Sequence, residues 1–161
     1  MEESTMSKIG DALANQFERI WMQVRPAIEN CPNAEWRRGD HPAFIPVRLA
    51  CHLVETVDYY AQPTPESFPG AGWGDVDWES GDVNALPDRD ALLAYMEEVR
   101  RRVDAWLRGL SDEELLGGNA FPWTGDSPME RMVYTLRHSQ HHLAEINEEL
   151  TRRGLPPAGW R

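Results

Sequence analysis

Two histidines, His138 and His142, stand four positions apart in the sequence. On an α-helix this spacing places both imidazole rings on one face, where two ring nitrogens can bind a single metal ion. A third histidine, His52, lies far away in the chain, between Leu49 and Leu53 of another apolar pattern. We therefore predict that His52, His138 and His142 together bind one divalent transition metal ion.

The alternative is that these residues are ordinary histidines of a helical bundle, hydrogen-bonded or exposed. A lone i, i+4 pair favours that interpretation, because such pairs also arise by chance. The third histidine shifts the balance towards metal binding. A buried neutral imidazole needs a partner for each ring nitrogen, and one ion satisfies a nitrogen on all three rings. His141 falls nearly opposite the apolar stripe of its helix, so we expect it to face solvent or an interface.

A site built from three neutral histidines leaves at least one coordination position open for water or a substrate atom. A divalent ion lowers the pKa of a bound water or thiol and so provides a nucleophile near neutral pH. Zinc, nickel, iron and copper all accept such ligands, and the residues alone do not choose among them.

Two glutamates lie close to the predicted ligands. Glu55 and Glu145 each follow a ligand histidine by three residues, within about 60° of it around the helix. They are the candidates for holding a histidine ring in place or for acting as a general base. Most such glutamates are solvated, and we favour that interpretation for both. Tyr59 is expected to serve packing, with lining of a pocket as the alternative, and Asp58 is expected at the surface.

Four segments with helical periodicity must position these residues. In each segment apolar residues recur every three or four positions, as burial of one helix face requires. The last segment has the clearest start, because Ser127, Pro128 and Glu130 combine an N-cap, a first-turn proline and a capping box. The predicted helices cover about residues 7–30, 43–61, 88–110 and 127–154, with a short helical turn at 111–114.

These helices, with no convincing strand pattern beside them, predict an all-α fold, a four-helix bundle. A chain of 161 residues suffices for one domain with a core and is too short to expect two, so residues 1–161 are predicted to form a single domain. Residues 62–87 form a long connection rich in Pro, Gly and Asp. Long connections in compact domains tend to carry function or to wrap a surface.

Two stretches of the chain resemble the DinB-like (YfiT-like) family of helical bundle proteins. Residues 50–60, ACHLVETVDYY, resemble the second helix of that family, which carries one metal-binding histidine. Residues 137–149, RHSQHHLAEINEE, resemble its HxxxH helix. By position, His52 matches the ligand of the second helix, and His138 and His142 match the pair of the fourth. The order and spacing of all four helices also fit, so the resemblance covers nearly the whole chain.

The sequence departs from the family pattern after the histidine pair. Ala144 stands where the family often has glycine, and Glu145 where it often has glutamine. The resemblance implies a bundle, frequently a homodimer, that holds nickel, zinc or a similar divalent ion. It also implies either thiol-dependent transfer or metal-assisted hydrolysis.

Charge and hydropathy exclude several partners. The chain has 27 acidic and 16 basic residues and a net charge of −11, which repels nucleic acids and anionic membranes. No apolar run reaches the roughly 18–20 residues that span a bilayer, and the acidic N-terminus does not resemble a secretory signal. We expect a cytoplasmic protein in which Cys31 and Cys51 are free thiols. Cys51, although it neighbours His52, is interpreted as a small buried hydrophobe.

Two functions are compatible with the histidine pattern and with what the resemblance implies. The first is a metal-dependent enzyme, either a small-thiol-dependent transferase or a hydrolase, acting on a small molecule, with residues 62–87 shaping the substrate pocket. The second is a non-catalytic, dimeric helical bundle that serves as a binding or stress-response protein.

Overall fold

A computed structural model gives the structure of the chain and describes all residues except 1–6, 74–76, 78 and 80. The part of the chain that it describes is all-helical and contains no strand, which confirms the predicted fold class. The long helices are α1 (Lys8–Glu29), α3 (Pro46–Tyr60), α4 (Arg89–Gly109) and α6 (Pro128–Arg152). The short elements are the helices α2 (Asn33–Trp36) and α5 (Asp112–Leu115) and the 3-10 turns Pro42–Phe44, Pro65–Ser67, Val83–Ala85 and Pro122–Thr124.

The helix starts follow the local capping chemistry. Ser127 accepts a hydrogen bond from the backbone N–H of Glu130 at the start of α6, as the sequence predicted. Ser111 and Glu114 form a complete capping box at α5, which confirms the short turn expected there. The second long helix starts later than predicted, at Pro46 rather than near residue 43. Pro46 disfavours helical dihedrals in the residue before it, and Ile45 is indeed extended (φ −81°, ψ 126°).

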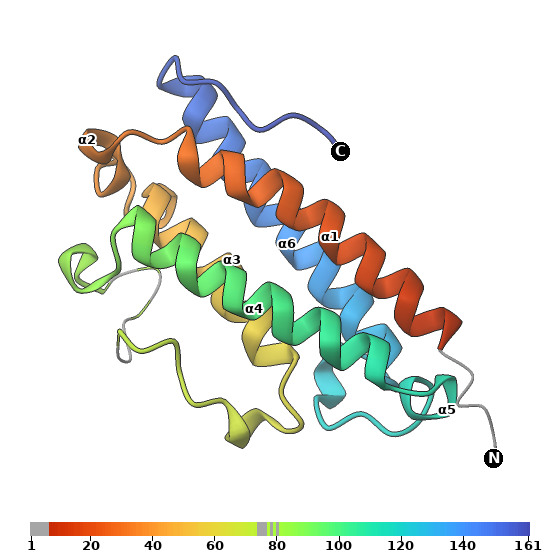
Figure 1. Ribbon diagram of the computed structural model, residues 1–161. Coiled ribbons are helices and arrows are strands. Elements are labelled where there is room, and N and C mark those ends of the chain that lie inside the picture. Colours follow the sequence, from red (N-terminus) through yellow and green to blue (C-terminus); the bar gives the residue numbers. More distant parts are fainter. Residues whose placement is uncertain (1–6, 74–76, 78, 80) are drawn as a thin grey trace.

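The four long helices form a bundle in which α1 and α6 run in one direction and α3 and α4 in the other (Figure 1). Around the bundle α1 contacts α4 and α6, and α3 contacts α6 and α4. The connection between α3 and α4 therefore returns along the whole bundle before α4 begins. This topology makes α3 and α6 antiparallel neighbours, and they are the helices that carry the predicted metal ligands.

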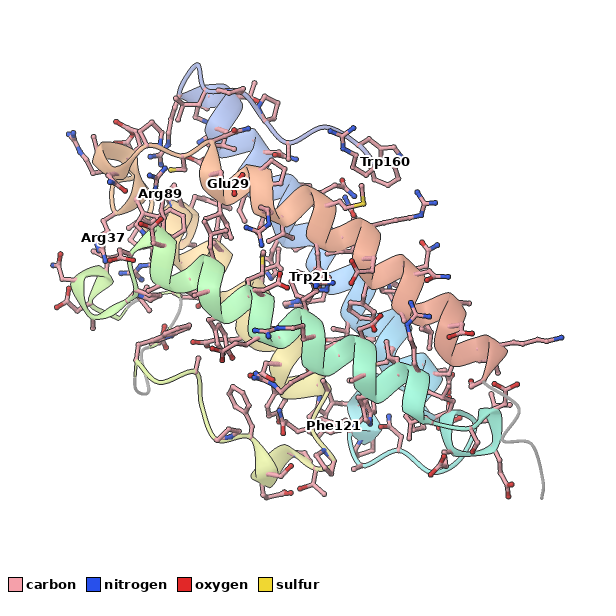
Figure 2. The ribbon with its side chains drawn as sticks, viewed as in Figure 1. Trp21, Glu29, Arg37, Arg89, Phe121 and Trp160 are labelled. Atoms are coloured by element: carbon pink, nitrogen blue, oxygen red, sulfur yellow. The ribbon has the colours of Figure 1, made fainter. Side chains whose placement is uncertain are left out.

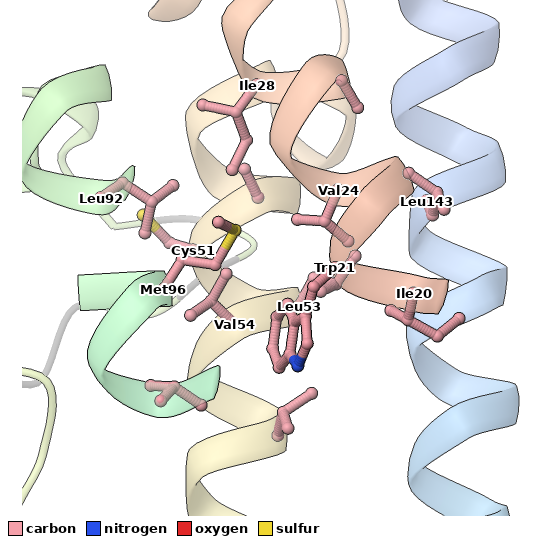
Figure 3. Close-up of a cluster of buried hydrophobic side chains, with 14 of the residues drawn as sticks. Ile20, Trp21, Val24, Ile28, Cys51, Leu53, Val54, Leu92, Met96 and Leu143 are labelled. Carbon is pink, nitrogen blue, oxygen red and sulfur yellow. The ribbon is translucent and has the colours of Figure 1, made fainter. Parts of the chain in front are cut away.

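The core lies between the four helices. Trp21 and Val24 of α1, Leu53 of α3, Met96 of α4 and Leu143 of α6 are all at most 3% exposed. Figure 3 shows these side chains meeting in one cluster. Cys51 is buried in the same cluster, so the interpretation of this residue as a small buried hydrophobe is confirmed. Burial of this apolar area is the main force that holds α3 against α6.

Arginines close one end of the bundle. Arg89 at the start of α4 donates a hydrogen bond to the carbonyl oxygen of Glu29, which the end of α1 leaves without a helical partner, and another to that of Cys31, just after the helix. Arg37 donates to the carbonyl oxygens of Val83 and Leu86. Figure 2 shows Arg37, Glu29 and Arg89 together at this end. These contacts tie the start of α4 to the chain that follows α1.

Asp58 of α3 was expected at the surface, and that prediction is wrong. Its side chain is 3% exposed and accepts hydrogen bonds from the Tyr95 hydroxyl at 2.6 Å and the Arg102 guanidinium at 2.8 Å. Both donors belong to α4. Burial of a carboxylate is costly unless hydrogen-bond donors replace the water that it loses, and a guanidinium and a hydroxyl group do so here. Asp58 therefore links the two parallel helices.

None of the described helices combines the length and the apolar character that crossing a bilayer requires.

Candidate metal centre

His52 on α3 and the pair His138 and His142 on α6 face one another across the interface of the two helices. The apolar residues that flank them, Leu53 and Leu143, are fully buried and fix the rotation of each helix. The histidines sit at the margin of these buried stripes. His142 is 6% exposed, and the other two are half-buried.

The three rings meet through the same nitrogen. The Nε2 atom of His138 lies 3.1 Å from Nε2 of His52 and 3.1 Å from Nε2 of His142. The ring centroids of His52 and His142 are 4.6 Å apart. The structure thus brings together the three residues that the sequence predicted as ligands, although 86 positions separate His52 from His138.

This arrangement fits a metal ion better than hydrogen bonds alone. A neutral imidazole carries one N–H, so the single Nε2 of His138 cannot donate to both neighbours. Its Nδ1 atom is buried and has no hydrogen-bond partner among the described residues. Two Nε2 ligands on one zinc ion, with bonds of about 2.0–2.1 Å, lie about 3.0–3.4 Å apart. The observed spacings of 3.1 Å fall in that range.

Burial keeps the three rings in the form that binds metal. Burial lowers the pKa of His52 to about 3 and that of His138 to about 4, with the neighbouring histidines adding to both shifts. Burial also lowers the pKa of His142, although Glu145 acts in the opposite sense. The three rings are therefore neutral at neutral pH, which is the protonation state that a metal ligand requires.

Glu145 is not the solvated side chain that we favoured from the sequence. Its carboxylate is 23% exposed and lies 2.6 Å from Nδ1 of His142 and 3.3 Å from Nε2 of His141. An ionised carboxylate only accepts, so Nδ1 of His142 carries the proton and its Nε2 presents a lone pair to the cluster. Glu145 is therefore the residue that orients a predicted ligand. His141 is 67% exposed, as expected for a residue that faces solvent.

Glu55 also departs from the favoured interpretation. It is half-buried and lines a cavity of about 370 Å³ together with His52 and His138. Burial raises the pKa of its carboxyl group to about 7, and the nearby Trp73 opposes part of that shift. Tyr59 both lines this cavity and packs against other rings, so the two roles considered for it are combined.

Two further aromatic residues line this cavity, and neither was predicted individually from the sequence. Tyr134 of α6 stands one turn before His138 and was counted in no apolar stripe. Phe68 comes from the long connection between α3 and α4, and it supplies the part of the pocket wall that we expected from that segment. The i, i+4 spacing of Tyr134 and His138 was the one available signal.

A second group of possible ligands overlaps the first. His141, His142 and Glu145 also place their ligand atoms within 4.8 Å of one another. This group is more exposed, and in it the carboxylate is already engaged with His142. The group of His52, His138 and His142 is more buried and draws on two helices.

Fold and site define a class: an all-helical bundle protein with a cluster of three histidines between two antiparallel helices. The DinB superfamily model matches residues 16–146, which include all of α3 and α4, most of α1 and α6, and the three histidines. The chain therefore belongs to the DinB superfamily, and the resemblance seen in residues 50–60 and 137–149 is confirmed. A comparison with curated proteins found no match.

Proposed function

We propose that this protein binds one divalent transition ion, nickel or zinc, through His52, His138 and His142, and that it uses the ion as a metal-dependent enzyme. The observation that carries the proposal is the convergence of three Nε2 atoms, with His138 3.1 Å from each of the other two. When bound, the ion would supply Lewis-acid chemistry that lowers the pKa of a water or thiol. The reaction class is metal-assisted hydrolysis or transfer to a small thiol.

The residues around the cluster have distinct duties in this proposal. Glu145 holds the ring of His142 so that Nε2 faces the ion. Glu55 lines the cavity beside His52 and is the carboxylate placed to accept a proton from a bound substrate. The cavity admits a small molecule next to the open coordination position, and membership of the DinB superfamily supports a metal site in this fold.

Metal analysis of protein purified without a histidine tag tests the ion. We expect close to one equivalent of zinc or nickel per chain, lost in His52→Ala and in His138→Ala. His41→Ala is the matched control, because His41 lies in the turn before α3 and outside the cluster. His141→Ala decides between the two ligand groups: retained metal supports the buried group, and lost metal supports the exposed one.

Turnover then tests the enzyme. Metal-loaded protein is assayed with ester and amide substrates and with glutathione-like, mycothiol-like and bacillithiol-like thiol donors. We expect turnover that disappears on chelation and returns when the ion is restored. Fully loaded protein that turns over none of these substrates would argue for a non-catalytic metal-binding bundle instead.

A further inference from the structure

The cavity beside the histidine cluster is walled mainly by aromatic rings. Two of its lining residues are the predicted metal ligands His52 and His138. The lining also includes Tyr59 and Tyr60 of α3 and Tyr134 of α6. Phe68, from the connection between α3 and α4, adds a further ring. A volume of about 370 Å³ suits one small ring system and its substituents.

These rings form a continuous surface that ends at the metal site. Tyr59 packs edge to face against Phe68, with centroids 5.7 Å apart, and against Tyr60 at 5.0 Å. Tyr60 packs in the same way against Tyr134 at 5.4 Å. The ring of Tyr134 lies nearly parallel to that of His138, at an angle of 20°. A planar molecule bound to the ion would therefore lie along aromatic faces and edges.

The aromatic wall is held in place before any ligand binds. Tyr59 and Tyr60 both pack against Phe121, which is fully buried at the end of the bundle where α6 begins (Figure 2). The hydroxyl of Tyr60 accepts a hydrogen bond of 3.1 Å from the indole N–H of Trp123. A preformed wall reduces the entropic cost of binding, so contact with it contributes directly to affinity.

The second observation is that the lining of the cavity, in the part of the chain that the structure describes, contains no cationic side chain. Among the described residues that line it, none is a lysine or arginine, and Glu55 is its one carboxylate. The nearby cation of Arg131 is stacked over the rings of Trp106 and Phe121 and donates to the carbonyl oxygen of Gln62. The ion would balance the charge of the donor atom that binds it, whereas a second anionic group farther from the ion would meet no lysine or arginine among the described lining residues.

We infer that the substrate of this site is a small, planar aromatic molecule with one donor atom for the ion and no anionic group beyond that atom, rather than an acidic thiol of the tripeptide kind. The donor atom binds beside His52 and His138, and the ring lies against Tyr134, Tyr59 and Phe68. This inference rests on the proposed metal site, because the ion fixes which end of the molecule enters first.

Thiol binding to cobalt-loaded protein tests the inference. Thiolate coordination to Co²⁺ gives a charge-transfer absorption in the near ultraviolet, so the same donor atom can be compared in different molecules. The probes are benzyl mercaptan, which is aromatic and uncharged, 3-mercaptopropionate, which is small and anionic, and glutathione. We expect the Kd of benzyl mercaptan to be at least tenfold lower than that of either anionic thiol.

Variants of the wall show whether the rings cause this preference. Phe68→Ala and Tyr134→Ala should each weaken benzyl mercaptan binding about fivefold or more and leave binding of 3-mercaptopropionate and of cobalt unchanged. Phe44→Ala is the matched control, because this half-buried aromatic residue borders a different cavity. A wild-type affinity for benzyl mercaptan in both wall variants would overturn the assignment of the wall.

The outcomes separate the two proposals. Stoichiometric cobalt with glutathione or 3-mercaptopropionate bound as tightly as benzyl mercaptan would overturn the substrate class and leave the metal site standing. Failure of cobalt, zinc and nickel to bind would overturn the proposed function and the substrate class together.

Discussion

At the scale of single residues, the 2.6 Å contact between His142 and Glu145 decides which ring nitrogen faces the cluster. A carboxylate that accepts from Nδ1–H fixes the tautomer and the orientation of the ring, and it makes Nε2 a better ligand. Replacing Glu145 by alanine removes that support and leaves the three histidines in place. We predict that Glu145→Ala lowers metal affinity about 10–100-fold.

Competition with a chromophoric chelator measures this effect on the folded protein. Glu148→Ala is the control, because Glu148 lies on the same helix, is exposed and pairs with Arg152 rather than with a histidine. Equal metal affinity in the two variants would show that Glu145 does not position the ligand.

Cys31 offers a residue-scale prediction about pH. Its side chain is fully buried, and burial raises the pKa of the thiol to about 11 despite the nearby Arg153 and Arg89. Only about one thousandth of such a thiol is ionised at pH 8. The Raman S–H stretching band of Cys31, identified by its loss in Cys31→Ala, should therefore persist in the folded protein up to about pH 10.

The unfolded protein provides the reference for Cys31. In concentrated urea the thiol should have an ordinary pKa near 8.5, so its S–H band should be largely lost by about pH 9.5. A folded protein that loses the S–H band of Cys31 over the same pH range would contradict the raised pKa.

The cluster of three histidines could be predicted from the sequence, and most of what surrounds it could not. His138 and His142 are revealed by helical spacing, since that spacing alone places two rings on one face. The role of Glu145 depends on a rotamer, and that of Glu55 on how far a neighbouring loop covers it. Asp58 was wrongly predicted at the surface because its hydrogen-bond donors belong to α4, and the sequence of α3 contains no pattern that indicates them.

At the scale of elements, α1 and α4 approach so closely that one contact requires glycine. A Cβ built on Gly10 would overlap the carbonyl oxygen of Leu107 in α4. Within a helix alanine is favoured over glycine by about 1 kcal/mol, whereas overpacking costs about 1–3 kcal/mol. Because a backbone carbonyl cannot rotate away, we predict that Gly10→Ala lowers the free energy of unfolding by about 1–2 kcal/mol.

Gly109→Ala is the matched substitution, because nothing lies within 4 Å of the added Cβ and the residue closes α4. It should leave stability unchanged or raise it by a few tenths of a kcal/mol. Urea denaturation with a common m-value compares the two variants. A Gly10→Ala protein as stable as Gly109→Ala would mean that the helices can separate at no cost.

The helices themselves were predictable to within a few residues, because apolar periodicity and caps are local signals. The start of α3 was placed too early because Pro42 and Pro46 both suit a first helical turn. The extended dihedrals of Ile45 show which proline opens the helix. The short α2 was missed, since four residues carry no readable period.

At the scale of the whole molecule, the order and direction of the helices determine which histidines come together. Four amphipathic helices with two longer connections are compatible with several arrangements, and periodicity does not select one. In the observed bundle α3 and α4 run parallel and α6 runs against α3 (Figure 1). This arrangement sets His52 opposite the pair on α6, at a level where the connection after α3 contributes Phe68 to the adjoining cavity.

Because the proposed ligands come from two helices, binding of the ion should stabilise the whole fold. The unfolded chain separates His52 from the pair, so an ion that binds only the folded protein adds about 2.7 kcal/mol at a free concentration 100 times its Kd. For a chain of this size that corresponds to a rise in Tm of roughly 5–10 °C. We predict such a rise when zinc is added to chelator-treated protein, its reversal by excess EDTA, and its absence in His52→Ala.

Circular dichroism at 222 nm follows the loss of helix in each melt, and His41→Ala, the control, should retain the full rise in Tm. A similar rise in His52→Ala would show that zinc stabilises the bundle without joining α3 to α6, since the two histidines of α6 alone cannot link the helices.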